Sequence, residues 1–191
     1  MGEPVYDLRL LSETGGSIRS SIGISVATEP LDDANFDTLM VGGSAVAGSL
    51  TPGVIKFLRR ALSDPRRVAS TCTGAFVLAE AGLLDGRRAT THWHRARDLQ
   101  ARFPKVKVEE DRIFIIDGPV WTSAGMTAGI DLALAMIEQD LGADVARAVA
   151  RQAGGLSPAR RWPVAVFGAA GAGAQIRPYP ERTGICEAQS R

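Results

Sequence analysis

One cysteine lies where a strand is expected to turn into a helix. Cys72 follows a predicted strand at residues 67–71 and precedes a stretch rich in alanine and leucine at residues 73–84. A sharp strand-to-helix turn exposes a nucleophile above a sheet, and the positive end of the helix dipole favours thiolate over thiol. Gly74 lets the helix begin close to the strand. The alternative is a buried structural cysteine, because free cysteine also packs as a small hydrophobic side chain.

The sequence offers few other groups for chemistry. His92 and His94 would face the same side of a strand, which allows a metal-binding pair, but no third ligand and no Cys-x-x-Cys spacing is evident. We therefore predict no metal site and no cofactor. The second cysteine, Cys186, is far from Cys72 in the sequence, and two cysteines do not make a disulfide framework.

Composition narrows the class of protein. The 191 residues suit one domain with a tail or one large domain, with 45% hydrophobic and 23% charged residues. A net charge of +1 gives no support for a chain-wide nucleic-acid or membrane surface. No apolar run approaches the roughly 18 residues of a membrane span, and residues 1–7 lack the regions of a signal peptide. A cytoplasmic location with no membrane partner is expected.

Apolar runs bounded by glycine and proline alternate with stretches of helical spacing. The predicted strands are at residues 6–11, 17–27 in one or two pieces, 36–41, 67–71, 88–93, 106–108, 113–116 and 120–123. The predicted helices are at residues 52–63, 73–84, 95–102 and 127–150. Asp117 and Gly118 turn the chain in what looks like a hairpin. This alternation predicts an α/β fold whose mostly parallel sheet is covered on both sides.

The alternation ends after residue 152. Residues 153–191 are rich in glycine, proline, alanine and arginine and show no convincing period. We predict one domain at residues 1–152 and a poorly ordered tail at residues 153–191.

Three segments in register carry a family resemblance. They are RVASTCTGAFVLAEAGLLDG at residues 67–86, ATTHW at 89–93 and VWTSAGMTAGID at 120–131. They resemble the ThiJ/PfpI superfamily, flavodoxin-like relatives of the class I glutamine amidotransferases. More narrowly, they resemble the amidase-like domain that precedes an AraC-type helix-turn-helix domain in bacterial transcriptional regulators. The resemblance runs from about residue 6 to residue 152, and it implies a flavodoxin-like three-layer sandwich with a strand–Cys–helix elbow.

The resemblance also implies roles for residues around the cysteine. Cys72 takes the elbow position, as a nucleophile or a ligand contact. Thr73 stands where catalytic members often carry a histidine base, which argues against base activation, although isonitrile hydratases share the Cys-Thr-Gly pattern. Gly42 and Gly43 match the family's glycine turn, whose backbone amides can hold an oxyanion near the cysteine.

Three further residues complete the predicted ligand site. His92 lies in a motif typical of the regulator branch, and we interpret it as lining the pocket or supporting it, with a catalytic base as the lesser alternative. Ser123 and Gly125 lie in the loop before the last helix. The predicted ligand-binding residues are Gly42, Gly43, Thr73, His92, Ser123 and Gly125, around Cys72.

Both ends depart from the family pattern. The family begins with a central strand and a helix that bring an acidic residue to the cysteine, and residues 1–4 are too short to replace them. We expect a truncated or misassigned start, or a compromised fold. Codons permitted by residues 163–190, read one nucleotide later, can spell a string like the start of an AraC-type domain. We therefore expect a frame slip between about residues 153 and 163, which a gene without a shifted helix-turn-helix would contradict.

The resemblance leaves three functions open. The preferred one is a sensing domain that binds a small nitrogen-containing or amide-like metabolite near Cys72, without specific DNA binding by this chain. The alternative is an enzyme: a cysteine-dependent hydrolase, amidase or isonitrile-hydratase-like protein. A redox sensor based on oxidation of Cys72 is the third. A homodimer is also expected, because family members commonly dimerise and a sheet without its first strand would expose apolar surface.

Overall fold

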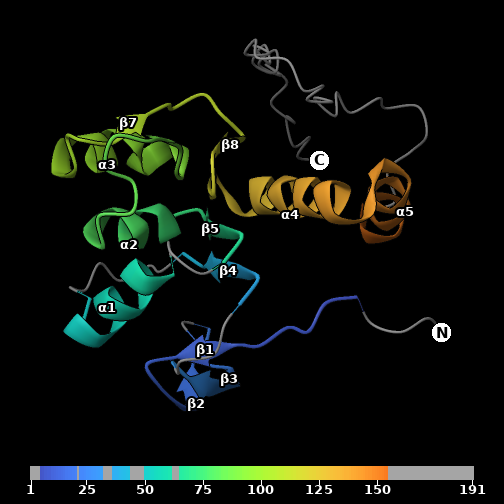
Figure 1. Ribbon diagram of the computed structural model, residues 1–191, viewed down its shortest axis with the longest axis horizontal. Helices are drawn as coiled ribbons and strands as arrows, with labels where there is room; N and C mark the ends of the chain where they lie inside the picture. The colour runs from blue at the N-terminus through green and yellow to red at the C-terminus, as the bar shows by residue number, and fades with distance from the viewer. Residues whose placement is uncertain (1–4, 21, 32–35, 44–49, 62–64, 155–191) are drawn as a thin grey trace, which may run out of the picture.

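The computed structural model describes residues 5–20, 22–31, 36–43, 50–61 and 65–154 (Figure 1). The strands are β1 (Leu11–Ser12), β2 (Thr14–Arg19), β3 (Ser25–Pro30), β4 (Thr38–Val41), β5 (Arg67–Thr71), β6 (Arg88–Ala89), β7 (Lys107–Val108), β8 (Phe114–Asp117) and β9 (Val120–Ser123). The helices are α1 (Pro52–Arg60), α2 (Gly74–Glu80), the 3-10 helix η1 (Trp93–Arg95), α3 (Ala96–Arg102), α4 (Met126–Leu141) and α5 (Ala143–Gly154). The expectations for residues 1–4 and for the tail from residue 155 onward, including the shifted frame, lie outside the described residues.

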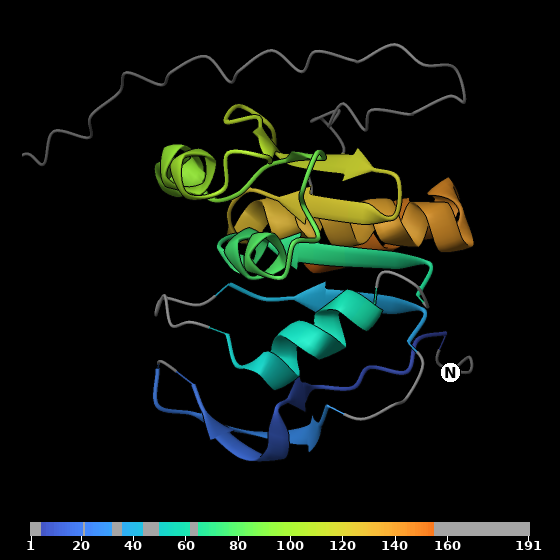
Figure 2. The same cartoon turned by 60° about the vertical axis from the view of Figure 1, so that its left-hand side comes forward.

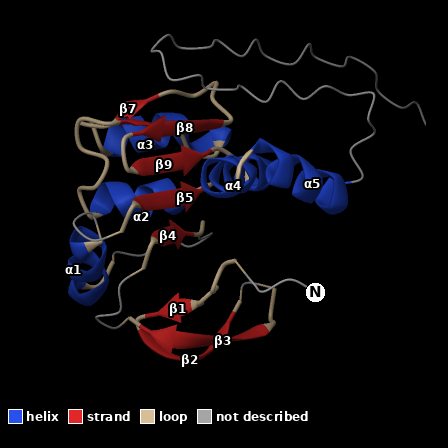
Figure 3. Ribbon diagram, turned by 45° about the vertical axis from the view of Figure 1, so that its right-hand side comes forward, coloured by secondary structure: helices blue, strands red, loops and turns tan. Residues whose placement is uncertain are grey.

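A mixed, mostly parallel sheet forms the centre of the domain. Its order is β4-β5-β9-β8, in which β4, β5 and β9 run parallel and β8 is antiparallel to β9 (Figure 3). Asp117 lies opposite Val120 at the closed end of the β8–β9 hairpin, where Gly118 has φ +59°. The hairpin predicted at this turn therefore joins β8 to β9, whereas β7 pairs in parallel with β6.

Alternate residues of the sheet supply two separate cores, one on each face. Val68 and Val120 are almost fully buried and pack in one cluster with Leu78 of α2. Their neighbours Ala69 and Trp121 face the other way, into a second cluster built on Leu132 and Met136 of α4. Because strand side chains alternate between faces, this division places α2 and α4 on opposite sides of the sheet, as the sequence pattern predicted.

A second, three-stranded sheet lies beyond β4 (Figure 2). In it β2 and β3 form an antiparallel pair and β1 runs parallel to β3. The strand predicted at residues 6–11 is reduced to Leu11–Ser12, although the Leu10 carbonyl still accepts a hydrogen bond from the Glu29 amide at 2.8 Å. Among the described residues no backbone bond to β3 continues this pairing at residues 6–9, so the strand does not extend to them.

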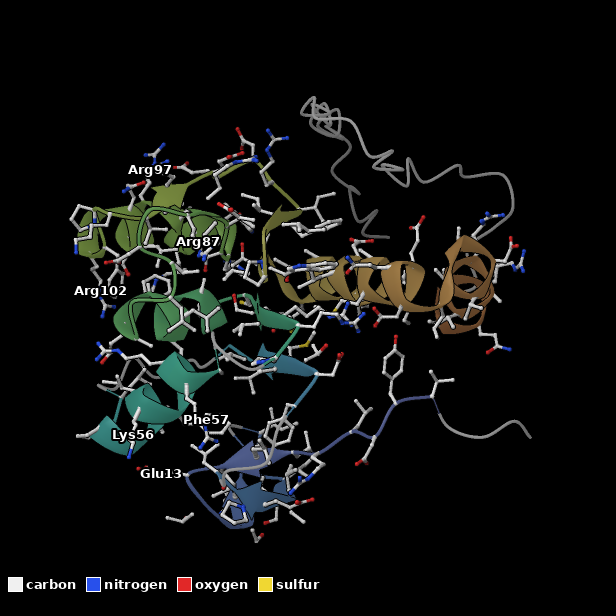
Figure 4. All side chains as sticks on the ribbon, in the orientation of Figure 1. Glu13, Lys56, Phe57, Arg87, Arg97 and Arg102 are labelled. Carbon is white, nitrogen blue, oxygen red and sulfur yellow. The ribbon has the colours of Figure 1, made fainter. Side chains whose placement is uncertain are left out.

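Side chains of α1 tie this small sheet to the rest of the domain. The Thr51 hydroxyl, which accepts a bond from the Val54 amide and so caps α1, donates to Glu13 at 2.5 Å. Phe57 of α1 also meets Phe36, which comes just before β4, edge to face with ring centroids 6.4 Å apart. Figure 4 shows Glu13 on the small sheet below Phe57 of α1. The helix predicted at residues 52–63 is confirmed over Pro52–Arg60, and its cap residue also links it to the small sheet.

The strand predicted at residues 88–93 ends after Ala89. Beyond that point side-chain bonds replace the strand ladder. The Thr90 amide donates to the Thr122 hydroxyl at 2.9 Å, and the Thr91 hydroxyl donates to the Cys72 carbonyl at 2.7 Å. Both threonines are fully buried, and the chain then turns into η1. Thr90 and Thr91 have the β-branched side chains typical of a strand, but here their hydrogen bonds hold a turn in place.

The long helix predicted at residues 127–150 is two helices. Gly142 separates α4 from α5 with φ +88° and ψ 162°, a backbone conformation that is open almost only to glycine. Its amide still donates to the Glu138 carbonyl at 3.0 Å, which closes the last turn of α4. Figure 1 shows α5 turned away from the axis of α4. No helix in the described part of the chain is long and apolar enough to cross a lipid bilayer.

Replacing Gly142 with alanine is expected to lower the free energy of unfolding by about 1–3 kcal/mol, because a Cβ is strained at this φ and ψ. Urea denaturation monitored by circular dichroism measures the change. Gly42→Ala is the control, since Gly42 has no left-handed φ and a Cβ there meets no atom within 4 Å, so alanine should be close to neutral. Equal effects of the two substitutions would contradict the strain at Gly142.

Candidate functional site

Cys72 is held in an unusual backbone conformation between β5 and α2. Its φ is +53°, and among the described residues no other non-glycine residue has a positive φ. Two hydrogen bonds fix it: the Cys72 amide donates to the Ser123 carbonyl at 3.1 Å, and its carbonyl accepts the Thr91 hydroxyl at 2.7 Å. Such a conformation costs about 1–3 kcal/mol and persists only where neighbours enforce it. The thiol is free and half-buried.

The glycine turn after β4 lies directly against this cysteine. A Cβ placed on Gly43 would stand 2.8 Å from the Thr73 hydroxyl and 3.3 Å from the Cys72 Cβ. A Cβ on Gly74 would overlap the Val41 carbonyl oxygen and stand 3.0 Å from that of Gly42. The start of α2 and the end of β4 thus approach each other at a distance that only glycine permits. The structure brings Gly42, Gly43, Cys72 and Thr73 together.

A second wall comes from η1 and the start of α4. A Cβ on Gly125 would lie 3.9 Å from the His92 Cδ2 atom, in ordinary van der Waals contact. The His92 ring is half-buried and stacks at 5.6 Å on the ring of His94, next to the exposed Trp93. Among the described residues no hydrogen bond joins His92 to Cys72. The geometry therefore gives His92 a place beside Gly125 and no direct link to the thiol.

Two serine hydroxyls near the site are buried without a partner. Ser70 in β5 and Ser123 in β9 are fully buried, and neither side-chain oxygen has a hydrogen-bond partner among the described residues. A buried hydroxyl left unpaired costs about 1–3 kcal/mol. Ser123 was predicted as a site residue and Ser70 was not. The only signal for Ser70 is its place near the end of the strand that leads to the cysteine.

The described residues contain no group of three or more histidine, cysteine or acidic side chains placed to hold a metal ion.

A cluster of charged residues that the sequence reasoning missed lies at the opposite end of β5. Arg67 is buried, its Nη1 donates to Asp140 at 2.9 Å, and a second nitrogen pairs with the other carboxylate oxygen. The Tyr6 hydroxyl donates to the same carboxylate at 3.0 Å. Arg66 bridges Asp140 at 2.8 Å and Asp37 at 2.7 Å. The cluster joins the N-terminal segment, the starts of β4 and β5, and the end of α4.

The partners of Asp140 in this cluster lower its pKa. Hydrogen bonds from Arg67, together with those from Tyr6 and Arg66, hold the pKa of Asp140 at about 2, below its usual 3.8. The Arg67 guanidinium also lies 5.4 Å from the centre of the Trp121 ring and donates to the Thr38 hydroxyl at 2.8 Å. The guanidinium nitrogens thus all donate to acceptors, and the Trp121 ring lies close to the group. A buried charge requires such partners.

Comparisons with known proteins give a consistent set of similarities. A family model described as the DJ-1/PfpI family matches residues 4–139. The HTH-type transcriptional regulator CdhR of Pseudomonas aeruginosa is 40% identical over 152 residues, which cover 78% of this chain and 45% of that regulator. The isonitrile hydratase of Pseudomonas putida is 38% identical over 139 residues, which cover 71% of this chain and 60% of the hydratase.

A solved structure of an AraC family transcriptional regulator from Pseudomonas putida superposes with a TM-score of 0.69 at 22% identity. The match covers 78% of this chain and 81% of that one, and at this identity it shows the fold alone. This chain spans about half the length of the curated regulators that it matches.

Proposed function

Because this chain belongs to the DJ-1/PfpI family and is similar to transcriptional regulators over most of its length, we propose that it senses a small metabolite. The family and the α/β fold predicted from the sequence are confirmed. In the proposal the metabolite is nitrogen-containing or amide-like and binds beside Cys72. An intact regulator passes the bound state to a DNA-binding domain, and the described residues make no specific contact with DNA. The domain self-associates through its exposed apolar surface.

One observation supports this proposal most: the glycine turn packs against Cys72, and among the described residues no basic side chain is hydrogen-bonded to the thiol. Gly43 stands against Cys72 and Thr73, so backbone groups rather than side chains form that side of the site. Thr73 follows the cysteine and cannot act as a histidine would in activating a thiol. His92 makes no hydrogen bond to Cys72 among the described residues. These features support recognition of a ligand more than turnover of a substrate.

The similarity to an isonitrile hydratase favours one competing function, a cysteine-dependent hydratase or hydrolase. In that candidate the Cys72 thiolate attacks an electrophilic carbon, and backbone amides of the Gly42–Gly43 turn stabilise the developing negative charge. Steady turnover of an amide or isonitrile that disappears in Cys72→Ala would establish this function and overturn the sensing proposal.

Gly43→Ala is expected to weaken metabolite binding at least about tenfold, because its Cβ enters the space next to Cys72 and presses on the Thr73 hydroxyl. A panel of small amides and amino acids is screened by thermal shift, and the affinity of the best compound is measured by calorimetry. Gly42→Ala is the matched control, since a Cβ there meets no atom within 4 Å, and it should change the affinity less than about twofold. Equal affinities in the two variants would place the ligand elsewhere.

A further inference from the structure

The first turn of α4 has free hydrogen-bond donors. This helix has 16 residues, begins at Met126 and is preceded by Gly125, which provides no side-chain cap. Its first turn contains no acidic residue. The first backbone N–H groups of a helix have no partner within the helix, and here no described residue accepts from the amides of Met126, Thr127 or Ala128. Together with the helix dipole, they form a patch of positive potential.

This helix start lies at the same edge of the sheet as Cys72. The parallel strands β5 and β9 are neighbours, and Thr71 at the end of β5 lies opposite Ser123 at the end of β9. The chain continues from Thr71 into Cys72, and from Ser123 through Gly125 into α4. Ligands of open α/β sheets bind outside the carboxyl ends of parallel strands, which is where these two segments meet. The ring of His92 closes one side, next to Gly125.

Ser123 gives an independent sign that a partner belongs here. Its hydroxyl is fully buried and unpaired among the described residues. It lies 3.9 Å from the position of a Cβ on Gly129, beside the first turns of α4, and its carbonyl holds the Cys72 amide. The hydroxyl is therefore buried against the first turns of α4 and lacks a partner there.

We propose that the start of α4 binds an oxyanion, the carboxylate or phosphate group of the ligand. This inference rests on the proposed sensing function and adds the acidic end of the metabolite to it. The amides of Met126, Thr127 and Ala128 donate to the oxyanion. The Ser123 hydroxyl, after rotation about its Cα–Cβ bond, donates to it as well, and the rest of the ligand extends toward Cys72 and the glycine turn.

The rate at which Cys72 is alkylated reports whether an oxyanion occupies this site. The whole chain is treated with iodoacetamide, which is uncharged, in acetate, phosphate or chloride at equal ionic strength, and modification of Cys72 and Cys186 is followed by peptide mass spectrometry. We expect acetate or phosphate to slow the reaction at Cys72 saturably relative to chloride. The rate at Cys186 in the same samples corrects for general effects of the ions. The acetate and phosphate arms distinguish a carboxylate from a phosphate as the preferred group.

A carboxylate built into the helix start supplies the decisive variant. Gly125 has φ −90° and ψ −170°, and a Cβ there meets only His92 at 3.9 Å, so aspartate fits as an N-cap. Gly125→Asp should raise the oxyanion concentration needed for half-protection at least about tenfold, because its own carboxylate occupies the amides at high local concentration. It should also raise the melting temperature without any oxyanion. Ile130→Asp adds the same charge at an exposed position beyond the first turn and should leave protection unchanged.

The outcomes separate the inference from the sensing function. Saturable protection in the unmodified chain and in Ile130→Asp, but not in Gly125→Asp, supports the oxyanion site. Absence of protection, or equal protection in Gly125→Asp, overturns it, even where an uncharged amide still binds at Gly43. If the oxyanion protects but no metabolite shifts the melting temperature, the oxyanion site stands and the sensing function fails.

Discussion

Arg67→Met should lower the free energy of unfolding by about 3 kcal/mol, because it leaves the Asp140 carboxylate buried without its main partner. The side chains of Arg67 and Asp140 are only 3% and 6% exposed, so water cannot replace the lost hydrogen bonds. Arg66 and Tyr6 keep some bonds to Asp140, which sets the expected loss at the lower end of the range for broken buried pairs. Urea denaturation at neutral pH measures the change.

The double variant Arg67→Met, Asp140→Leu shows whether the loss in the free energy of unfolding comes from the unpaired Asp140 charge or from lost packing. Removing both charges should recover a large part of the stability, since an apolar pair of similar volume is often as stable as a buried ion pair. If the double variant is as unstable as Arg67→Met alone, the loss comes from packing against Trp121 and not from the unpaired carboxylate.

The same cluster gives the stability a dependence on pH. Hydrogen bonds from Arg67 lower the pKa of Asp140 from 3.8 to about 2 in the folded chain. A lowered carboxyl pKa contributes stability that is fully present above the unfolded value and is lost as the pH falls toward the folded value. The loss between about pH 4 and pH 2 should amount to roughly 2 kcal/mol. Asp140→Asn should remove this part of the acid dependence, and an unchanged profile in that variant would assign it to other carboxylates.

The second large effect is expected at Gly74, where alanine should cost about 3 kcal/mol or more and also abolish metabolite binding. The added Cβ would overlap the Val41 carbonyl oxygen, and a second backbone oxygen, that of Gly42, would lie 3.0 Å away. Backbone atoms cannot rotate aside as a side chain can, so α2 would have to move off the end of β4. Urea denaturation and calorimetry measure the two losses.

The displacement of α2 would separate Cys72 from the glycine turn, and for this reason stability and binding should fall together in Gly74→Ala. Gly42→Ala serves as the control, because it adds the same methyl group on the other side of the contact and meets no atom within 4 Å. A Gly74→Ala variant whose free energy of unfolding stays within about 0.5 kcal/mol of the parent would contradict this close approach.

The sequence was most informative where signals were local. A short apolar run ending in glycine located β4, and the strand predicted at residues 67–71 located β5. The position of Cys72 between a strand and a helix followed from the second of these. The residues of the predicted site come from four segments, and the family resemblance was needed to relate them. The structure then places Gly43 against Cys72 and His92 against Gly125. Their roles in binding stay predictions, which the Gly43→Ala and Gly125→Asp variants test.

Features that depend on distant partners could not be predicted. Arg67 and Asp140 are 73 residues apart, and a buried arginine has no signature in a sequence because most arginines are exposed. Gly142 lies within a continuous helical period, and a glycine there fits either an unbroken helix or a break. Only its φ decides between them. The threonines after β6 have strand-forming side chains, but their hydroxyls and amides serve turn contacts instead.

The five residues of β5 place the stabilising cluster and the cysteine at opposite ends of a single strand. Arg67 begins the strand, and Cys72 follows its last residue, so roughly 16 Å of extended backbone separates them. A substitution beside the cysteine therefore leaves the contacts between Arg67 and Asp140 untouched. Under the proposed sensing function, ligand preference can change at one end of β5 while the buried ion pair at the other end keeps its partners.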